Sequence, residues 1–454
     1  SISIDGPTNL AVSDNFRKRF ESYGWDYILI NGHNYNEIFK ALKKVQNAKK
    51  PTVISCKTKI GYGSPNKMGK ASSHGSPLGK EEINLIRKKL NWKYKPFEIP
   101  NHVLNQWKKI GNKGSMLNTK WNKVYKKNKN KINKSFKNNF SKSIKSEKHR
   151  AIKELKSLAT RKSSELFLNS ITYKNNCLLG GSADLTGSNN TKTKYHNIIK
   201  PGDFSGNYIH YGVREHAMCG IMNGISLHSK IIPYGGTFLI FSDYCKPSIR
   251  LSALMEQQVI YVMTHDSIGL GEDGPTHQPI EQLSSLRAIP NLNIFRPADR
   301  METIECWELA LKNSKRPSVL SLTRQNLDPI RKKYSNNNKC SFGAYEVLRT
   351  KKKVDLTILA SGSEVNLAIE ASLKLAKNKI YSKVISVPCQ DIFDLQSTSY
   401  KRKILEETEI KISIEAGSTD CWKKYVGKKG ATFGIDEFGK SAPYKDIYKH
   451  FGLT

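Results

Sequence analysis

The sequence predicts a multidomain α/β protein built mainly on parallel sheets, and three observations support this prediction. The chain has 454 residues, which is too many for one ordinary hydrophobic core. Strand and helix signals alternate in three separate regions, as they do where helices connect parallel strands. A stretch rich in Lys, Asn and Ser separates the first region from the second. We therefore expect four segments, at residues 1–100, 101–150, 151–329 and 340–454.

Residues 1–100 are expected to form the end of a parallel α/β unit. Tyr27–Ile30 and Thr52–Cys56 have the apolar, β-branched composition of buried strands. Between them, Asn34 and Glu37 have the spacing of a capping box at a helix N-terminus. The apolar face of that helix consists of Ile38, Leu42 and Val45.

Residues 101–150 are expected to be a basic linker that contains an amphipathic helix. Apolar side chains recur there at near-helical spacing: Trp121, Tyr125, Ile132, Phe136, Phe140 and Ile144. Such a stripe usually packs against a neighbouring domain, and we favour that interpretation. A helix lying on a membrane surface is the alternative.

The regions at 151–329 and 340–454 repeat the alternation of strands and helices. Strands are indicated at Cys177–Leu179, Val259–Val262, Ser318–Leu322, Leu356–Leu359, Lys383–Val387 and Lys411–Ile414. Ser361–Glu364 is interpreted as a capping box that opens a helix over Val365–Leu375.

The composition limits which classes of partner can be expected for the protein. The net charge is +36, but the lysines are spread along the chain together with asparagine, as in Lys126–Lys131, a mixture typical of an AT-rich genome. We therefore expect no nucleic-acid partner, although a positive field would attract phosphorylated ligands. No apolar run is long enough to span a membrane, so no membrane partner is expected. The eight cysteines are scattered without a C-x-x-C pair, as expected for reduced thiols in a cytoplasmic protein.

The densest polar segment is Thr264–Pro279, which follows a predicted strand and so lies where open α/β sheets bind ligands. It contains G-x-G-x-x-G at Gly269–Gly274, formally a dinucleotide-binding fingerprint. Pro275 and Pro279 interrupt the helix that this fingerprint requires, and no acidic residue follows at a strand end about 20 residues later. A glycine-rich loop that presents two imidazoles and a carboxylate to a ligand fits the pattern better.

Other segments also combine glycine with polar residues: Gly206–His216, Gly180–Ser188, Lys57–Ser64 and Ser73–Gly79. Glu215 beside Arg214 has a surface ion pair as its ordinary interpretation. His210 and His216 lack the H-E-x-x-H order, which argues against zinc. Each segment, taken alone, is equally compatible with a loop that merely needs glycine.

Taken together and in this order, these segments resemble those of transketolases. The resemblance runs from Ser1 nearly to Thr454 and is weakest in the linker. Its most specific strings are S-H-G-x-P-L-G at Ser73–Gly79, Y-G-V-R-E at Tyr211–Glu215 and T-H-D-S-I-G-L-G-E-D-G-P-T-H-Q-P at Thr264–Pro279.

The resemblance implies a fold, an activity and partners. Residues 1–100 would be the last part of a diphosphate-binding domain, 151–329 a pyrimidine-binding domain and 340–454 a C-terminal transketolase domain. Members of the family are homodimers that hold thiamine diphosphate, with Mg²⁺, Ca²⁺ or another divalent cation, between subunits. They are transferases of the pentose phosphate pathway. They reversibly move a two-carbon ketol unit from a ketose phosphate of the xylulose 5-phosphate type to ribose 5-phosphate or erythrose 4-phosphate.

The resemblance also implies cofactor residues. Glu215 matches the glutamate that hydrogen-bonds the aminopyrimidine and promotes ylid formation, a role that suits a buried carboxyl. Phe238 and Phe241 match the aromatic residues that stack on the pyrimidine. Without the resemblance, two core phenylalanines on a helix would be the better interpretation. His74 matches a catalytic histidine between the diphosphate and the first carbons of the sugar.

The remaining implied residues contact the sugar phosphate. Arginine suits phosphate because its guanidinium can donate two parallel hydrogen bonds. Asp273 and His277 match groups near the reacting hydroxyls, where the configuration of the ketose is recognised. The full implied substrate set is His74, Arg161, Ser188, His265, Asp273, His277 and Arg324.

The start of the chain departs from the family pattern. Ser1–Gly6 lacks an initiator Met and a secretory signal and has the composition of the end of a strand, so we expect that an N-terminal segment of the same protein is missing. By resemblance, the Gly-Asp-Gly segment and the Asn that hold the metal and the diphosphate would precede Ser1. Ile2 alone remains of the metal-binding positions, through its backbone carbonyl.

Two alternatives remain open at this stage. A dihydroxyacetone synthase would carry nearly the same strings. A non-catalytic fragment with a binding role is the alternative from another class, although Glu215, His265 and Arg324, whose loss would support it, are all present.

Overall fold

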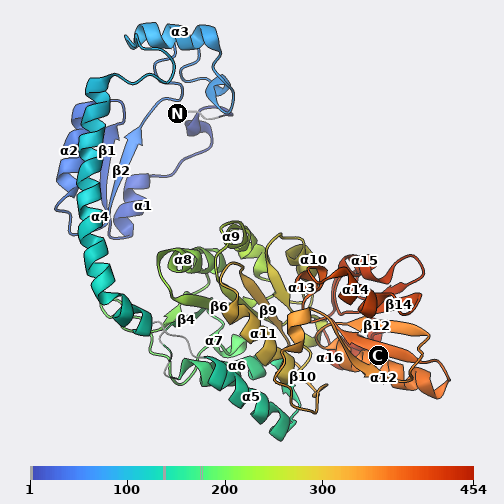
Figure 1. Ribbon diagram of the computed structural model, residues 1–454. Coiled ribbons are helices and arrows are strands. Elements are labelled where there is room, and N and C mark those ends of the chain that lie inside the picture. Colours follow the sequence, from blue (N-terminus) through green and yellow to red (C-terminus); the bar gives the residue numbers. More distant parts are fainter. Residues whose placement is uncertain (1–3, 136–139, 174, 176) are drawn as a thin grey trace. The chain divides into compact units, whose positions relative to one another are not determined.

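The computed structural model describes residues 4–135, 140–173, 175 and 177–454. The chain divides into two compact units, Ser1–Lys126 and Lys127–Thr454, which we call the first and second units. Figure 1 shows the elements of both, and each unit is described by itself. Ile2 and Phe136 lie outside the described residues.

The first unit is centred on a two-stranded parallel sheet, β1 (Asp26–Asn31) with β2 (Thr52–Lys57), which confirms both strands expected here. The strands are less buried than predicted, because Leu29 of β1 is 57% exposed and only Ile30 is fully buried. A pair of strands has too few neighbours to cover both of its faces. The other elements are η1 (Thr8–Leu10), α1 (Phe16–Ser22), α2 (Tyr35–Val45), η2 (Ala71–Ser73), α3 (Lys80–Lys89) and the first part of α4.

The predicted start of α2 is confirmed, but its capping differs in detail. The Asn34 side chain accepts hydrogen bonds from the backbone N–H groups of Asn36 and Glu37, at 3.0 and 3.3 Å. The Glu37 carboxylate accepts from the backbone of Asn31 and from the side-chain amide of Asn34, but not from the backbone N–H of Asn34, so only half of the capping box forms. The expected apolar face is only partly buried, since Leu42 remains exposed.

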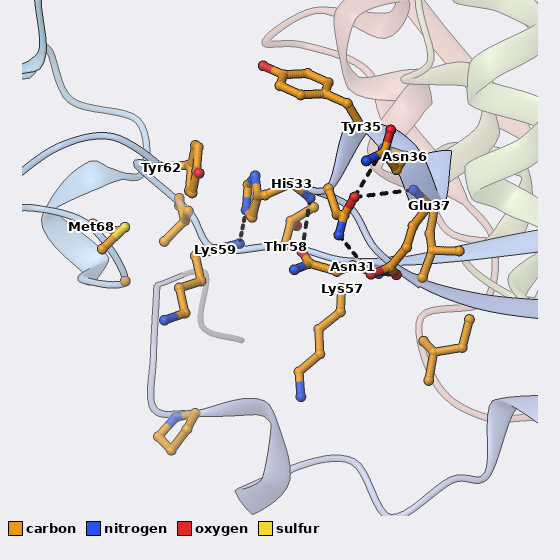
Figure 2. Close-up of a pocket in the computed structure, with 16 residues that line it drawn as sticks. Asn31, His33, Tyr35, Asn36, Glu37, Lys57, Thr58, Lys59, Tyr62 and Met68 are labelled. Carbon is orange, nitrogen blue, oxygen red and sulfur yellow. Dashed lines mark hydrogen bonds between the residues drawn. The ribbon is translucent and has the colours of Figure 1, made fainter. Parts of the chain in front are cut away.

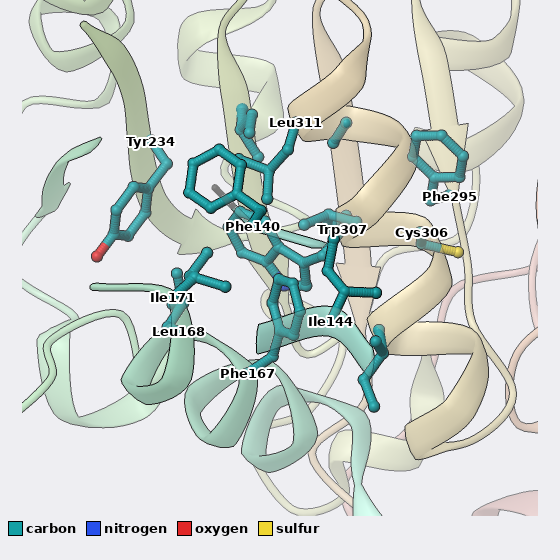
Figure 3. Close-up of a cluster of buried hydrophobic side chains, with 14 of the residues drawn as sticks. Phe140, Ile144, Phe167, Leu168, Ile171, Tyr234, Phe295, Cys306, Trp307 and Leu311 are labelled. Atoms are coloured by element: carbon teal, nitrogen blue, oxygen red, sulfur yellow. The ribbon is translucent and has the colours of Figure 1, made fainter. Parts of the chain in front are cut away.

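The linker consists of two helices, α4 (Asn101–Ser135) and α5 (Phe140–Glu154). Within the second unit, Phe140 and Ile144 are buried against α6 (Thr160–Thr172) and α11 (Arg300–Lys312). Figure 3 shows them beside Phe167 and Trp307. This part of the predicted stripe therefore packs as expected. Trp121, in the first unit, is instead 59% exposed and stacks on Tyr125 with 4.9 Å between ring centroids.

The second unit contains a fully parallel six-stranded sheet in the order β5-β4-β6-β7-β9-β8. Its strands are β4 (Leu178–Ser182), β5 (Tyr208–His210), β6 (Ile232–Phe238), β7 (Ile260–Thr264), β8 (Asn293–Phe295) and β9 (Ser318–Leu322). The three strands predicted from this region correspond to β4, β7 and β9. β6, which lies between β4 and β7, was not predicted.

Helices cover both faces of this sheet (Figure 1). Successive residues of β7 point to opposite faces, so that Ile260 and Val262 pack with α6 and α11, whereas Tyr261 and Met263 pack with α8 and α9. The helices are α6 (Thr160–Thr172), α7 (Thr186–Asn189), α8 (Glu215–His228), α9 (Ser242–Leu254), η3 (Ile268–Leu270), α10 (Gln282–Arg287) and α11 (Arg300–Lys312). A short antiparallel pair joins β3 (Leu158–Ala159) to β10 (Asn326–Leu327).

The C-terminal region has a five-stranded sheet in the order β11-β13-β12-β14-β15. Its strands are β11 (Tyr345–Arg349), β12 (Leu356–Ala360), β13 (Ser382–Ser386), β14 (Ile410–Ile414) and β15 (Ala431–Phe433). All pairs are parallel except β11 with β13, which is antiparallel and changes register between Glu346 and Leu348. The three predicted strands are β12, β13 and β14. The helices are η4 (Lys339–Phe342), α12 (Glu364–Lys377), α13 (Gln390–Asp394), α14 (Thr398–Leu405), η5 (Asp420–Trp422), α15 (Lys423–Val426) and α16 (Tyr444–His450).

The interpretation of Ser361–Glu364 as a capping box is wrong. α12 starts at Glu364, one residue before the expected start at Val365. The Ser361 hydroxyl, the expected cap, donates to Glu415, and the Ser363 side chain accepts no capping hydrogen bond from the helix backbone. Glu364 is fully buried and accepts from Arg296 and from the backbone of Ala416. A buried carboxylate needs a charged partner, and this requirement outweighs local capping.

Candidate functional site

The expected site residues of the second unit lie at one edge of the six-stranded sheet. β4, β6, β7 and β9 are parallel neighbours, so the loops that follow them emerge at the same edge. These loops and the helices after them carry Ser188, Phe238, Phe241, His265, His277 and Arg324. Arg161 joins them from the start of α6. This is where open parallel sheets bind ligands.

The two predicted stacking residues form an aromatic pair at this edge. Phe238 ends β6 and Phe241 directly precedes α9, so they lie around a strand-to-helix turn and not on one helix. Their ring centroids are 5.5 Å apart with an interplanar angle of 17°. Phe238 also contacts His265 at 3.8 Å, and Phe241 contacts His277 edge-on at 5.5 Å between centroids. The pair therefore belongs to the polar loop cluster and is not confined to the hydrophobic core.

His265 is held in an unusual position. Its φ of +61° lies in the left-handed region, which is uncommon for a residue with a Cβ. Nδ1 lies 2.8 Å from Thr264 Oγ1, which in turn accepts a hydrogen bond from Asn189 Nδ2 at 2.8 Å. Burial, followed by the positive charges of Arg161 and Arg324, lowers the pKa of His265 to about 3. The imidazole is therefore neutral at neutral pH and can exchange hydrogen bonds with hydroxyl groups.

Two guanidinium groups face the same space. Arg161 Nη1 donates to the backbone carbonyl of Ser188 at 2.8 Å. Burial lowers the pKa of Arg161, and the nearby positive charge of Arg324 lowers it further. Arg324 donates to the carbonyl of Leu270 and lies 3.8 Å from the carboxylate of Glu272. Two like charges this close to each other favour an anionic ligand between them.

Glu215 is the first residue of α8, where the helix dipole favours a carboxylate, and it is only 8% exposed. Within the described residues, no hydrogen bond or ion pair to the Glu215 carboxylate is seen. His277 is half-buried, with Nδ1 2.9 Å from Thr276 Oγ1. Asp273 is exposed, and no hydrogen bond or ion pair seen among the described residues ties it to the cluster.

The first unit contains the remaining expected residues. His74 follows η2, is exposed, and donates its backbone N–H to the carbonyl of Ala71 at 2.9 Å. Ile2, the expected metal position, lies outside the described residues. In the part of the chain that the structure describes, no group of three or more His, Cys, Asp or Glu side chains could hold a metal ion. No helix described is long and apolar enough to cross a membrane.

A pocket of about 1370 Å³ lies in the first unit at the carboxyl ends of β1 and β2. Figure 2 shows His33 lying flat against Tyr62, with Lys57 and Lys59 nearby. His33 Nε2 accepts the backbone N–H of Lys59 at 2.9 Å. The Lys57–Ser64 segment thus contributes to a pocket, as its polar composition suggested, but His74 does not line it.

Asn189, which connects the strand ends beside Phe238 and His265, was not identified from the sequence. Asn189 Nδ2 donates both to Thr264 Oγ1 and to the backbone carbonyl of Thr237, so it links the ends of β6 and β7. Nothing in the sequence around Asn189 indicates this role, because its partners lie 48 and 75 residues away.

The chain matches three family models in succession. They describe the thiamine diphosphate binding domain of transketolase at residues 1–148, its pyrimidine binding domain at 156–329 and the transketolase-like C-terminal domain at 343–454. Together these matches cover nearly the whole chain.

Curated and solved relatives agree with these matches. The transketolase of Sinorhizobium medicae is 44% identical over all of this chain and 66% of its own length, and that of Cereibacter sphaeroides is 42% identical over all of this chain and 69% of its own. The crystal structure of transketolase from Campylobacter jejuni superposes on the whole chain with a TM-score of 0.89 at 36% identity, over 69% of that chain. The chain thus spans about two thirds of the length of these relatives. With its aromatic pair, its paired arginines and its three matched domains, it belongs to the transketolase family of transferases.

Proposed function

We propose that this protein transfers a two-carbon ketol unit from a ketose phosphate of the xylulose 5-phosphate type to ribose 5-phosphate or erythrose 4-phosphate, in the pentose phosphate pathway. One observation supports this proposal most directly. At a single sheet edge, two arginines suited to a phosphate lie beside a neutral histidine and a pair of stacked aromatic rings. Such a site can bind a phosphorylated sugar at one end and a flat heterocycle at the other.

Arg161 and Arg324 would bind the phosphate of the sugar, with the Ser188 hydroxyl as a further donor. Arg161 is already oriented by its bond to the Ser188 carbonyl. His265, His277 and Asp273 would recognise the sugar hydroxyls, and the neutral imidazole of His265 can both donate and accept hydrogen bonds. His74 would act near the first carbons of the sugar.

Thiamine diphosphate fits the residues around Phe238. The stacked pair of Phe238 and Phe241 offers a flat apolar surface, and Glu215 offers a buried carboxylate to which no hydrogen bond or ion pair is seen among the described residues. Phe238, Phe241 and Glu215 would hold the aminopyrimidine. When bound, the cofactor supplies a nucleophilic carbon and an electron sink for the two-carbon unit. Glu215 would hold a proton at the aminopyrimidine, and the two rings would keep water from that side of the site.

We further propose Mg²⁺, or another divalent cation, at the diphosphate, with the Ile2 carbonyl as one ligand. A diphosphate carries several negative charges. Lys, Arg or a metal ion must neutralise these charges when the diphosphate moves from water into a binding site. We keep the domain boundaries 1–100, 151–329 and 340–454 as proposals, with 101–150 as linker. The starts of the last two are close to those of the matched family models.

A homodimer is proposed on the exposed apolar surface of α8 and α9. Exposed large apolar side chains gather on and just after these helices: Ile221, Leu227, Tyr244, Leu251, Leu254 and Met255. A monomer rarely exposes such a group, and a second copy of the same face would cover it.

All eight cysteines are unpaired thiols, which supports a reducing compartment such as the cytoplasm.

The test is ketol transfer from xylulose 5-phosphate to ribose 5-phosphate by the purified protein, with thiamine diphosphate and Mg²⁺ varied separately. Saturable dependence on both supports the proposal, and absence of transfer at saturating concentrations of both refutes it. A strong preference for an acceptor without phosphate would favour a dihydroxyacetone synthase-like enzyme instead. Binding of the ligands without turnover would favour a non-catalytic role.

A further inference from the structure

One buried arginine joins the loop that carries His265 to the C-terminal region. Arg296 follows β8, and its side chain is fully buried. Its Nε donates to Asp266 Oδ2 at 2.9 Å. Asp266 directly follows His265 in the chain, so this bond fixes the loop one residue away from the imidazole.

The rest of the guanidinium is bound by the segment that opens α12. Nη1 donates to the Ser361 carbonyl at 2.8 Å and to Glu364 Oε2 at 2.5 Å, and Nη2 donates to Ser363 Oγ at 3.1 Å. Gly362, with a φ of +55°, lets the backbone approach closely, since a Cβ there would lie 2.8 Å from the Arg296 side chain. The C-terminal region therefore fixes the guanidinium that fixes Asp266.

A second contact from the same region reaches the other end of the loop. Gln278 Nε2 donates to the backbone carbonyl of Lys440 at 2.8 Å and to that of Gly271 at 2.8 Å. The loop from Thr264 to Pro279 is thus tied to the C-terminal region at both of its ends.

His265 depends on such support. A left-handed backbone at a residue with a Cβ persists only where the surrounding structure imposes it. On its N-terminal side, Thr264 Oγ1 bonds to the imidazole, and on its C-terminal side Asp266 is held by Arg296. The charged and titratable groups that face the imidazole are Arg161, Arg324 and His277, all on other elements.

We propose that Arg296 is a positioning residue for His265: by fixing Asp266, it keeps the His265 backbone left-handed and the imidazole against Phe238. Through this bond the C-terminal region acts on the sugar-phosphate site, although it supplies none of the residues expected to touch the sugar. The kinetic consequence rests on the proposed function, whereas the effect on the imidazole does not.

The test compares Arg296→Lys with the matched control Arg287→Lys. Arg287 is buried in the same interface and binds Glu415 through two hydrogen bonds of 2.7 and 2.8 Å, but it makes no hydrogen bond to residues 264–279. Lysine keeps the positive charge in both variants, but its single ammonium group cannot make all the hydrogen bonds that a planar guanidinium donates. Both variants should therefore lose similar thermal stability, while only Arg296→Lys releases the loop.

The first measurement is the NMR signal of His265 in the 454-residue chain labelled with ¹³C at histidine, assigned with a His265→Gln variant. In the unmodified chain and in Arg287→Lys, this signal should not titrate between about pH 5.5 and 8. In Arg296→Lys the imidazole gains water, and the signal should titrate in that range. The second measurement is kinetic: Arg296→Lys should raise KM for the sugar phosphate on the order of tenfold with little change in kcat, and Arg287→Lys should not.

A folded Arg296→Lys variant whose His265 signal stays fixed overturns the proposal. Equal changes in both variants also overturn it, because they would mean that the bond to Asp266, which Arg296 makes and Arg287 does not, is not what fixes His265. If Arg296→Lys does not fold, Asp266→Ala replaces it, since alanine removes the acceptor of the bond from Arg296 Nε. Its His265 signal must then titrate for the proposal to stand. A wild-type protein without ketol transfer would refute the proposed activity, and the NMR comparison would still decide the positioning role.

Discussion

The imidazole of His265 and the ring of Phe238 lie 3.8 Å apart between centroids, at the carboxyl ends of two neighbouring strands. His265 is the group expected to bind the sugar, and Phe238 is the group expected to stack on the cofactor, so this contact connects the two parts of the candidate site. Because both side chains are nearly fully buried, a change at either one alters the surroundings of the other.

The depressed pKa of His265 predicts an acid sensitivity. The folded-state pKa is about 3 and the ordinary value is 6.5, so below pH 6.5 the unfolded chain binds a proton that the folded chain does not. Stability from this residue should therefore fall as the pH drops from about 6.5 towards 3. Thermal unfolding of the protein and of His265→Gln at pH 5 and pH 7.5 checks this. The stability difference between the two proteins should shift in favour of the variant at the lower pH. A difference that is the same at both pH values would show that the histidine titrates normally.

Replacing Glu215 by Gln should abolish most of the turnover while leaving cofactor binding. The amide keeps the shape of the side chain but cannot exchange a proton, so ketol transfer should fall roughly 10²–10⁴-fold. Stopped-flow or coupled assays with xylulose 5-phosphate and ribose 5-phosphate measure the rate, and calorimetry measures the binding of thiamine diphosphate. Glu370→Gln, at an exposed position of α12, is the matched control and should be neutral. Near-normal turnover of Glu215→Gln would refute its assignment.

The paired arginines predict a selective loss for phosphorylated substrates. Arg161→Ala or Arg324→Ala should remove roughly 1.5–3 kcal/mol of charged hydrogen bonding, seen as a higher KM for sugar phosphates. Free sugars have no phosphate to lose, so their kcat/KM should change little. Arg402→Ala, on the exposed face of α14, controls for loss of positive charge. If free sugars and sugar phosphates lose equally, these arginines do not bind the phosphate.

Two tryptophans should differ in their contribution to stability. Trp307 is fully buried and its Nε1 donates to Ser164 Oγ at 2.9 Å, so Trp307→Ala should cost roughly 3–5 kcal/mol. Trp121 is mostly exposed, and Trp121→Ala should stay within about 1 kcal/mol. Denaturant unfolding measures both changes. Comparable losses would mean that Trp121 is covered in solution.

Strand prediction succeeded where composition and environment agree. Ser318–Leu322 is a short run in which Val319, Leu320 and Leu322 are apolar, and it forms β9 with the predicted limits. β6 failed the same criteria because it contains Pro233, Gly235 and Gly236, although all seven of its residues are buried. The glycines are required by packing and not by the strand: a Cβ at Gly235 would lie 2.4 Å from Met222 Sδ, and one at Gly236 would lie 2.8 Å from Thr191. Only the tertiary structure contains that information.

The candidate site, like the strands, could be predicted from the sequence only in part. The polar loops were recognisable because glycine, histidine and acidic residues cluster within a few positions of each other. The structure places His277 and Arg324 near His265. The bond from Arg296 to Asp266 was not recognisable, since the two residues are 30 positions apart and neither stands in an unusual context. The burial of both residues, which makes the pair significant, is a property of the folded chain.

The irregular edge of the C-terminal sheet limits how another chain can contact this region. β11 changes register between Glu346 and Leu348, and Arg349 at its end is paired with both Glu346 and Glu407. A bulged, charged outer strand is a poor template for another backbone, and the opposite outer strand, β15, has only three residues. Strand addition at either border is therefore disfavoured. Another chain that contacts this region is left to do so through side chains, where a single substitution can change the contact without disturbing a hydrogen-bond ladder.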